Sequence, residues 1–109
     1  MAYEELRGKV AIVGADEADE NGVQPDKSVL QLHAESASNA MRDAGLKKED
    51  IDGVFTAGTS AATLTEYLGL TPRYIDGTSV GGCSFIIMIE HAMLALVHGM
   101  CNYALISHG

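Results

Sequence analysis

The stretch from Phe85 to Val97 is apolar on nearly every side, and it constrains the fold more than any other part of the chain. Its length and its content of alanine, leucine and methionine favour a helix over a strand. A helix that is apolar all round is expected to be buried all round. A single domain of 109 residues rarely encloses such a helix, because it has few layers to pack above and below it. The sequence therefore predicts that a second sheet or another chain covers this helix.

Cys83 stands directly ahead of this helix, within the run SVGGCSF from Ser79 to Phe85. A cysteine in the first turn of a helix meets free backbone N–H groups and the positive end of the helix dipole, and both favour the thiolate. The two preceding glycines have no Cβ, so the chain can turn sharply there. This pattern predicts a nucleophile elbow, in which a strand, a tight turn and a helix present a reactive side chain. The alternative is a buried cysteine that fills a small space under the helix, since free cysteines are often buried.

Four apolar or β-prone runs alternate with helical segments along the chain. Strands are predicted at 9–14, 51–56, 73–79 and 102–106, and helices at 29–44, 63–68 and 84–98. Ser28 and Gln31 form a capping-box pattern ahead of the first helix, and Gly45 is suited to end it. The segment 15–26 is polar and is expected to be an exposed loop. The β-α-β-α-β-α-β order is typical of an α/β domain with a mostly parallel sheet.

Composition excludes several classes of function. The chain has 15 acidic residues against 7 scattered basic ones, which provides no surface for nucleic acid or anionic lipid. Its two cysteines lack metal-ligand spacing, so neither a zinc site nor a disulfide framework is expected. The segment Val13–Ala18 has only one of the three glycines of a dinucleotide-binding motif, so nucleotide binding is not expected there. No signal peptide or membrane-spanning segment is apparent, and a cytoplasmic protein is expected.

The remaining polar residues on apolar segments are interpreted as structural. His33 and His91 lie on apolar helical faces and are expected to be hydrogen-bonded core histidines. His98 falls in a last helical turn, where an imidazole complements the helix dipole. Cys101 is expected to pack in the interior. Glu90 would be a buried carboxylate and would then need a partner that the sequence does not identify.

Three stretches of the chain carry a family resemblance: KVAIVG at 9–14, the segment from 30 to 55, and the segment from 74 to 105. Together they resemble the N-terminal half of a thiolase and are most similar to the sterol-carrier-protein-type acetyl-CoA acetyltransferases. The third stretch is the most specific. Its helix is headed by Cys83 and ends in the pattern Gly-x-Cys-Asn at 99–102, as expected for the nucleophile helix of that fold.

The resemblance implies an architecture for the chain. Residues 1–109 would form the N-terminal βαβαβαβ part of a five-layered αβαβα thiolase-like fold, truncated before the second half. In that fold the nucleophile helix is buried between two sheets, which would account for its apolar character. The resemblance also implies a homodimer, with the strand before the elbow near the two-fold interface.

The resemblance also implies a reaction. By the family's motif, Cys83 is the catalytic nucleophile of an acyltransferase, and it takes up an acyl group from a coenzyme A thioester. Coenzyme A or a second acyl-CoA then attacks the enzyme thioester in a ping-pong cycle. The backbone N–H of Cys83 would contribute to an oxyanion hole. No bound cofactor or metal is expected, since acyl-CoA and CoA are substrates.

Two departures from the family pattern limit this expectation. Phe85 and Ile86 occupy places where many thiolases have small residues and a glycine, which would narrow the acyl pocket or change which acyl chain fits. The general-base histidine, the second acid/base cysteine and the CoA-gripping loop belong to the other half of the fold, so this fragment alone is expected to be inactive. No catalytic role is assigned to the chain's histidines or to Cys101, because they do not match those motifs.

Two alternatives remain open from the sequence. The first is a thiolase-fold acyl-CoA lyase, or retro-aldolase, that works with a small OB-fold partner protein. The second is a noncatalytic thiolase-like module, whose apolar helix pairs with a separate chain to complete its core.

Overall fold

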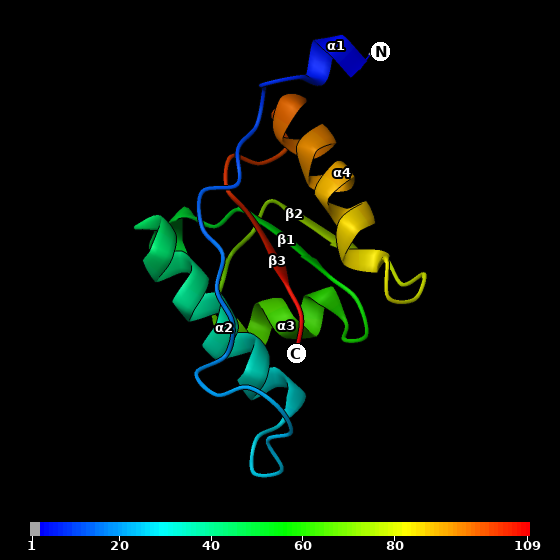
Figure 1. The fold of residues 1–109 in the computed structure, drawn as a ribbon. Coiled ribbons are helices and arrows are strands. Elements are labelled where there is room, and N and C mark those ends of the chain that lie inside the picture. Colours follow the sequence, from blue (N-terminus) through cyan, green and yellow to red (C-terminus); the bar gives the residue numbers. More distant parts are fainter. Residues whose placement is uncertain (1–2) are drawn as a thin grey trace.

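The computed structural model describes residues 3–109 (Figure 1). Its elements are α1 (Tyr3–Leu6), α2 (Val29–Ala44), the 3-10 turn η1 (Lys48–Asp50), β1 (Gly53–Thr56), α3 (Ala61–Leu68), β2 (Tyr74–Gly77), α4 (Ser84–Val97) and β3 (Ala104–Ser107). The strands form one parallel sheet in the order β2-β1-β3. The predicted α/β class with a parallel sheet is confirmed, and α1 is an element that the sequence analysis did not predict.

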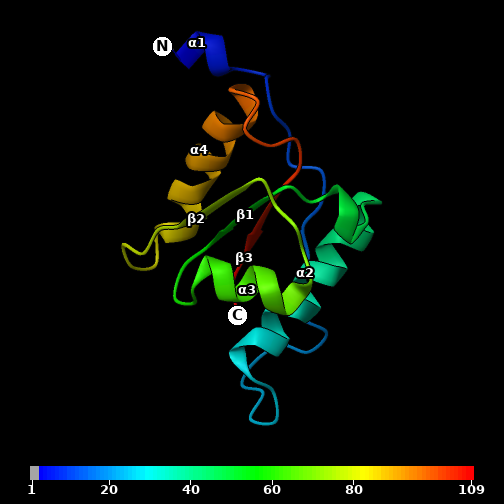
Figure 2. The same cartoon turned by 180° about the vertical axis from the view of Figure 1, so that it is seen from behind.

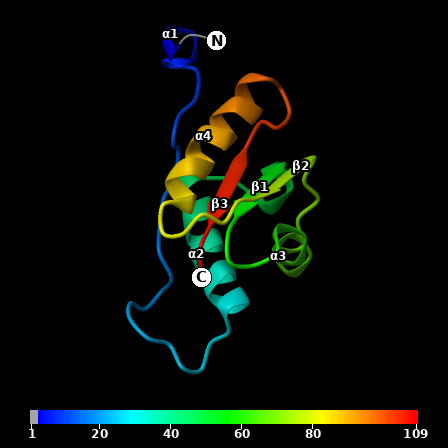
Figure 3. The ribbon, with the colours of Figure 1, turned by 90° about the vertical axis from the view of Figure 1, so that its right-hand side faces the viewer.

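Helices cover both faces of the sheet (Figure 3). Successive side chains of a strand point to opposite faces, and β1 shows this alternation in its core residues. Val54 packs in one apolar cluster with residues of α2 and α3, whereas Phe55 packs in a second cluster with Met88 and Ala92 of α4. Because β1 is central and covered on both faces, all four of its residues are buried.

The start and end of α2 follow from local sequence. Ser28 accepts a hydrogen bond from the backbone N–H of Gln31, and the Gln31 side chain accepts one from the backbone N–H of Ser28. At the other end, Gly45 adopts a left-handed conformation with φ of 71°. Both features confirm the predicted capping box and terminating glycine.

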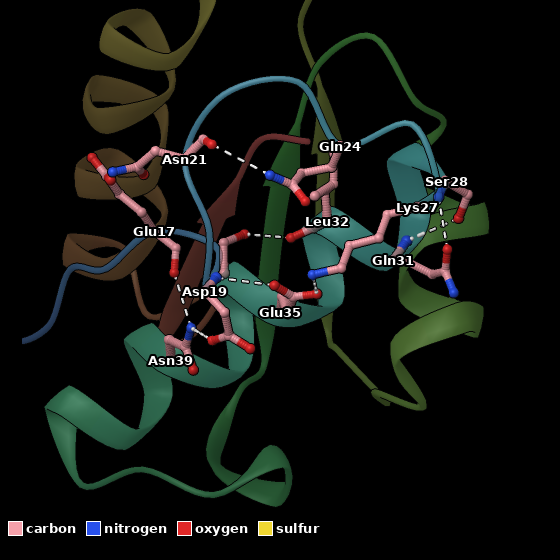
Figure 4. Close-up of polar contacts among 11 residues, drawn as sticks. Glu17, Asp19, Asn21, Gln24, Lys27, Ser28, Gln31, Leu32, Glu35 and Asn39 are labelled. Carbon is pink, nitrogen blue, oxygen red and sulfur yellow. Dashed lines mark hydrogen bonds and ion pairs between the residues drawn. The ribbon is translucent and has the colours of Figure 1, made fainter.

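The loop ahead of α2 is held on that helix by polar contacts (Figure 4). The Asn39 side chain donates to the Glu17 carbonyl at 2.9 Å and to the Asp19 carboxylate at 2.8 Å. The Glu35 carboxylate accepts from the backbone N–H of Asp19 at 2.9 Å and pairs with the Lys27 ammonium at 2.6 Å. The predicted polar loop is therefore present, and it is attached to the helix that it precedes.

The predicted strand at 9–14 is wrong. This segment passes the sheet without joining it (Figure 3), and β3 pairs directly with β1. Ile12 and Val13 are 77% and 59% exposed, so the apolar run lacks the strand partner that would satisfy its backbone and bury its side chains. Gly14 instead lies against α2. A Cβ on Gly14 would come within 2.7 Å of the Ala40 carbonyl oxygen, so this close approach requires glycine.

Helix α4 is buried on one side and exposed on the other. Met88, Ala92 and Ala95 are buried against the sheet, whereas Ile86 is 70% exposed. The expectation of burial on every side is therefore not met within this chain, since the sheet covers one face of the helix. Glu90 is exposed, so the predicted buried carboxylate is also wrong. Across residues 3–109, no helix combines the length and the apolar character needed to cross a membrane.

Candidate active site

Cys83 lies where β2 gives way to α4, on a loop that projects from the side of the molecule (yellow in Figures 1 and 2). The chain leaves β2 at Gly77 and enters α4 at Ser84, with Cys83 in the N-cap position. Gly81 has φ of +93°, a conformation that other residues adopt with strain. The predicted order of strand, glycine turn and helix is present. The catalytic role of Cys83 stays a prediction.

The two cysteines occupy opposite environments. Cys83 is exposed, and its Sγ lies 3.7 Å from the Val80 carbonyl oxygen. Cys101 is fully buried, and burial, with a smaller contribution from the nearby Asp52 carboxylate, raises the pKa of its thiol. The alternative of a cysteine packed in the interior therefore describes Cys101, as predicted, and does not describe Cys83.

The turn before α4 is held by the side chain of Ser84. Its hydroxyl oxygen accepts a hydrogen bond from the backbone N–H of Val80 at 2.8 Å and donates one to the Gly81 carbonyl at 2.6 Å. The Ser84 side chain is 1% exposed. These contacts fix the backbone that carries Cys83. The sequence analysis gave Ser84 no role, although its place directly after the cysteine was a usable signal.

A second polar group joins β2 to α4 a little further from Cys83. The Asp76 carboxylate accepts from the His91 Nδ1 at 2.7 Å and from the Thr78 hydroxyl at 3.0 Å. Thr78 Oγ1 also lies 3.3 Å from His91 Nδ1. His91 is hydrogen-bonded, as predicted, but it is partly exposed, with 35% of its side chain accessible. The roles of Asp76 and Thr78 were missed, because their contact with His91 depends on the fold.

The other three histidines have three different surroundings. His33 is buried as predicted, and its Nδ1 lies 2.7 Å from the Ser107 hydroxyl. His98 caps the C-terminal end of α4 and is exposed. The imidazole of His108 stacks on the ring of Phe85, with 4.5 Å between centroids. Within residues 3–109, no three metal-ligating side chains gather in one place.

Two pockets lie near the sheet and the elbow. One, of about 490 Å³, sits at the carboxyl ends of β1 and β2 and reaches Ser79 of the elbow. This edge of a parallel sheet is where α/β proteins commonly bind ligands. The other, of about 720 Å³, is an apolar groove between segment 9–14, β3 and α4. Cys83 does not line either of these two pockets.

The sheet order, the elbow and the helix behind it define a class: the chain has part of a thiolase-like fold. Several solved structures show this likeness. A monomeric SCP2-thiolase like protein type 1 from Mycobacterium smegmatis superposes with a TM-score of 0.71 and 22% identity, over 87% of this chain. The Ltp2-ChsH2(DUF35) aldolase gives a TM-score of 0.70 and 24% identity over 85% of this chain. OleA from Xanthomonas campestris, with bound lauric acid and lauroyl-CoA, gives 0.67 and 21% over 76%.

One curated relative is more similar in sequence. The 17-hydroxy-3-oxo-4-pregnene-20-carboxyl-CoA lyase of Mycobacterium tuberculosis (strain ATCC 25618 / H37Rv) is 30% identical over 101 residues, which are 89% of this chain. No protein-family model matches the chain. The chain spans about a quarter of each relative: 26% of the lyase, 22% of the SCP2-thiolase like protein, 25% of the aldolase and 27% of OleA. The thiolase resemblance is thus confirmed for the fold.

Proposed function

We propose that the chain is the nucleophile-bearing N-terminal part of a thiolase-type acyl-CoA acyltransferase, with Cys83 as the nucleophile. The observation that carries this proposal is the placement of Cys83: an exposed thiol at the N-cap of α4, on a glycine turn held by Ser84. The helix dipole favours negative charge at this position, although no backbone N–H at the start of α4 donates to the Cys83 side chain. The likeness to OleA, whose solved structure holds lauroyl-CoA, supports acyl-CoA as the substrate class.

The proposed first step is a thioester exchange. The Cys83 thiolate attacks the acyl carbonyl of acyl-CoA, an S–C bond forms at Cys83 Sγ, and the bond between the acyl carbon and the CoA sulfur breaks. Coenzyme A leaves as a thiolate and takes up a proton. In the second step, CoA or the enolate of another acyl-CoA attacks the enzyme thioester and frees Cys83. The base for that second step would come from the other half of the thiolase fold.

The second candidate function is an acyl-CoA lyase that cleaves an aldol adduct. The similarity to a CoA lyase at 30% identity and to an aldolase structure favours it. An aldol cleavage breaks a C–C bond beside the thioester and needs no acyl group on cysteine. If the whole protein is a lyase, we expect it to work with a small OB-fold partner protein. The similar aldolase structure contains Ltp2 together with ChsH2(DUF35).

Assembly and location are further parts of the proposal. If the protein is a thiolase-type acyltransferase, we expect a cytoplasmic homodimer with β2 near its two-fold axis. β2 is an edge strand, so its outer backbone groups have no strand partner among residues 3–109. The similar SCP2-thiolase like protein is monomeric, so a partly similar fold also occurs without a dimer. Measuring the oligomeric state of this protein therefore tests the proposed homodimer.

Mass spectrometry of the intact protein after incubation with lauroyl-CoA or acetyl-CoA tests the nucleophile. The test uses a protein in which this chain is joined to the rest of the thiolase fold. The acyltransferase reading predicts one acyl group per chain, located on the peptide that contains Cys83 and removed by added CoA. Cys83→Ala should abolish both the adduct and turnover, and Cys101→Ala should leave both.

The same protein distinguishes the alternatives. If Cys83→Ala keeps full turnover on an aldol adduct of acyl-CoA, the lyase is correct and the acyltransferase is not. If neither reaction occurs and no acyl group is found on Cys83, the noncatalytic module is supported. Sedimentation of the protein alone, and with a DUF35-type partner, then measures which assembly forms.

A further inference from the structure

The group formed by Asp76, Thr78 and His91 is not used by the thiolase-type step, yet it joins the two elements on either side of the elbow. Asp76 lies near the end of β2, Thr78 directly follows that strand, and His91 is in the middle of α4. Because a carboxylate can only accept, His91 must carry its proton on Nδ1 to bond Asp76 at 2.7 Å. The second carboxylate oxygen is held by the Thr78 hydroxyl at 3.0 Å.

His91 is too far from Cys83 to act as its base. A helix rises about 1.5 Å per residue, so eight residues separate the two positions by about 12 Å along the axis of α4. A proton transfer requires heavy atoms about 3 Å apart. An effect of His91 on Cys83 must therefore pass through the backbone that connects them.

The apolar packing of α4 does not by itself hold this helix against β2. The helix packs mainly on β1 and β3, whereas the elbow departs from β2. Apolar contacts thus set the distance of α4 from the centre of the sheet, and the bond between Asp76 and His91 ties it to the strand that leads into the turn. The side chains of this pair are 21% and 35% exposed, so solvent competes with the bond only in part. Hydrogen bonds to a carboxylate are stronger than those between two neutral groups.

We infer that Asp76, Thr78 and His91 form a clasp that positions the Cys83 elbow. Asp76 and His91 are positioning residues: they hold the end of β2 against α4, and Ser84 then fixes the turn on the helix. This inference rests on the proposed nucleophile for its functional meaning, but the clasp itself can be measured without any reaction.

Hydrogen exchange on the 109-residue chain tests the clasp directly. Two amides report on the elbow: Val80, which donates to the Ser84 side chain, and Ser84, which donates to the Gly81 carbonyl. In His91→Ala both amides should exchange about tenfold faster or more, as expected when a charge-assisted hydrogen bond that limits local opening is lost. His91→Asn keeps an N–H donor at the position of Nδ1, within reach of Asp76, and should restore most of the protection.

Controls separate the clasp from general stability. The amides of Val54 and Phe55 in β1 should keep their exchange rates in His91→Ala, and His98→Ala, at the exposed end of the same helix, should change neither region. Unchanged exchange at Val80 and Ser84 in His91→Ala would overturn the clasp, as would an equal increase in β1 or a failure of His91→Asn to restore protection.

A second measurement relates the clasp to the cysteine. The rate at which iodoacetamide alkylates Cys83 at pH 7.5 reports on the thiol in its elbow. The clasp predicts that this rate moves toward that of the urea-unfolded chain in His91→Ala and returns in His91→Asn. If the unaltered chain already reacts at the rate of the unfolded chain while exchange at Val80 responds as predicted, the clasp stands and the nucleophile proposal fails.

Discussion

The imidazole of His33 and the hydroxyl of Ser107 meet at 2.7 Å and join α2 to the last residue of β3. Both residues are buried, with exposed fractions of 1% and 5%. The same region is closely packed, because the Ser107 carbonyl accepts from the Thr56 hydroxyl and a Cβ on Gly109 would lie 2.6 Å from the His33 ring. A proton added to His33 would therefore place a charge in a site with no counterion among these contacts.

This contact predicts a dependence of stability on pH. Burial, and to a smaller extent His108, lowers the pKa of His33. In the unfolded chain the pKa is about 6.5, so below that pH the unfolded state binds more protons than the folded state. The free energy of unfolding should therefore fall as pH drops below about 6.5. Urea denaturation at pH 5, 6, 7 and 8 measures this slope. His33→Gln should reduce it, whereas His98→Gln should not, and an equal slope in both variants would contradict the assignment.

A second prediction concerns the close approach of β1 to Cys101. A Cβ on Gly53 would lie 2.8 Å from Cys101 Sγ and 3.1 Å from its Cβ. Both residues are buried, so the backbone must move to admit the extra carbon. Gly53→Ala should lower the free energy of unfolding by about 1–3 kcal/mol, as overpacked cores commonly do.

The matched variants for this prediction lie in the same chain. Gly82→Ala adds the same carbon where nothing lies within 4 Å, and its free energy of unfolding should change by less than about 0.5 kcal/mol. Combining Gly53→Ala with Cys101→Ala removes Sγ and should recover part of the loss, so the two changes should be non-additive. Strict additivity in denaturation experiments would show that the two side chains do not clash.

The parts of the fold that were predictable depend on local signals. The capping box at Ser28, the glycine after α2 and the turn before Cys83 are each determined by neighbouring residues. The strand expected at 9–14 had the right composition, but a strand forms only where another strand pairs with it, and composition does not reveal the partner. Here β3 pairs directly with β1.

The candidate site likewise contains one part that neighbouring residues predict and another that depends on the fold. The placement of Cys83 on a glycine turn ahead of a helix was predictable, because the glycines before it and the helix after it are adjacent in sequence. The bond from Asp76 to His91 spans 15 residues and exists because β2 and α4 lie side by side in space. Its one local signal was the alternation of Asp76 and Thr78, which places both polar side chains on one side of the extended chain. A sequence pattern thus predicted the turn that carries Cys83 but missed the hydrogen bonds of Asp76 with Thr78 and His91.

A third prediction tests the role of Ser84 in the elbow. Ser84→Ala removes the acceptor for the Val80 N–H and the donor for the Gly81 carbonyl. Because the hydroxyl is buried and makes both bonds, its loss should cost about 1–3 kcal/mol of unfolding free energy. Ser38→Ala on the exposed side of α2 is the control and should be neutral or slightly stabilising, since alanine favours helices. Equal effects of the two changes, measured by thermal or urea unfolding, would show that Ser84 does not hold the turn.

The last prediction concerns the reactivity of the two cysteines. Thiolate is the reactive form, and access decides how fast it is attacked. Cys83 is exposed at a helix N-terminus, whereas Cys101 is buried and burial raises the pKa of its thiol. At pH 7.5, iodoacetamide should therefore label Cys83 at least about tenfold faster than Cys101. Peptide mapping by mass spectrometry at increasing times gives both rates. Cys83→Ala should remove the fast phase and leave the slow one, and urea should bring the two rates in the unaltered chain close together. Labelling of Cys101 first, or at an equal rate in the folded chain, would contradict both the exposed elbow and the buried packing described for the two thiols.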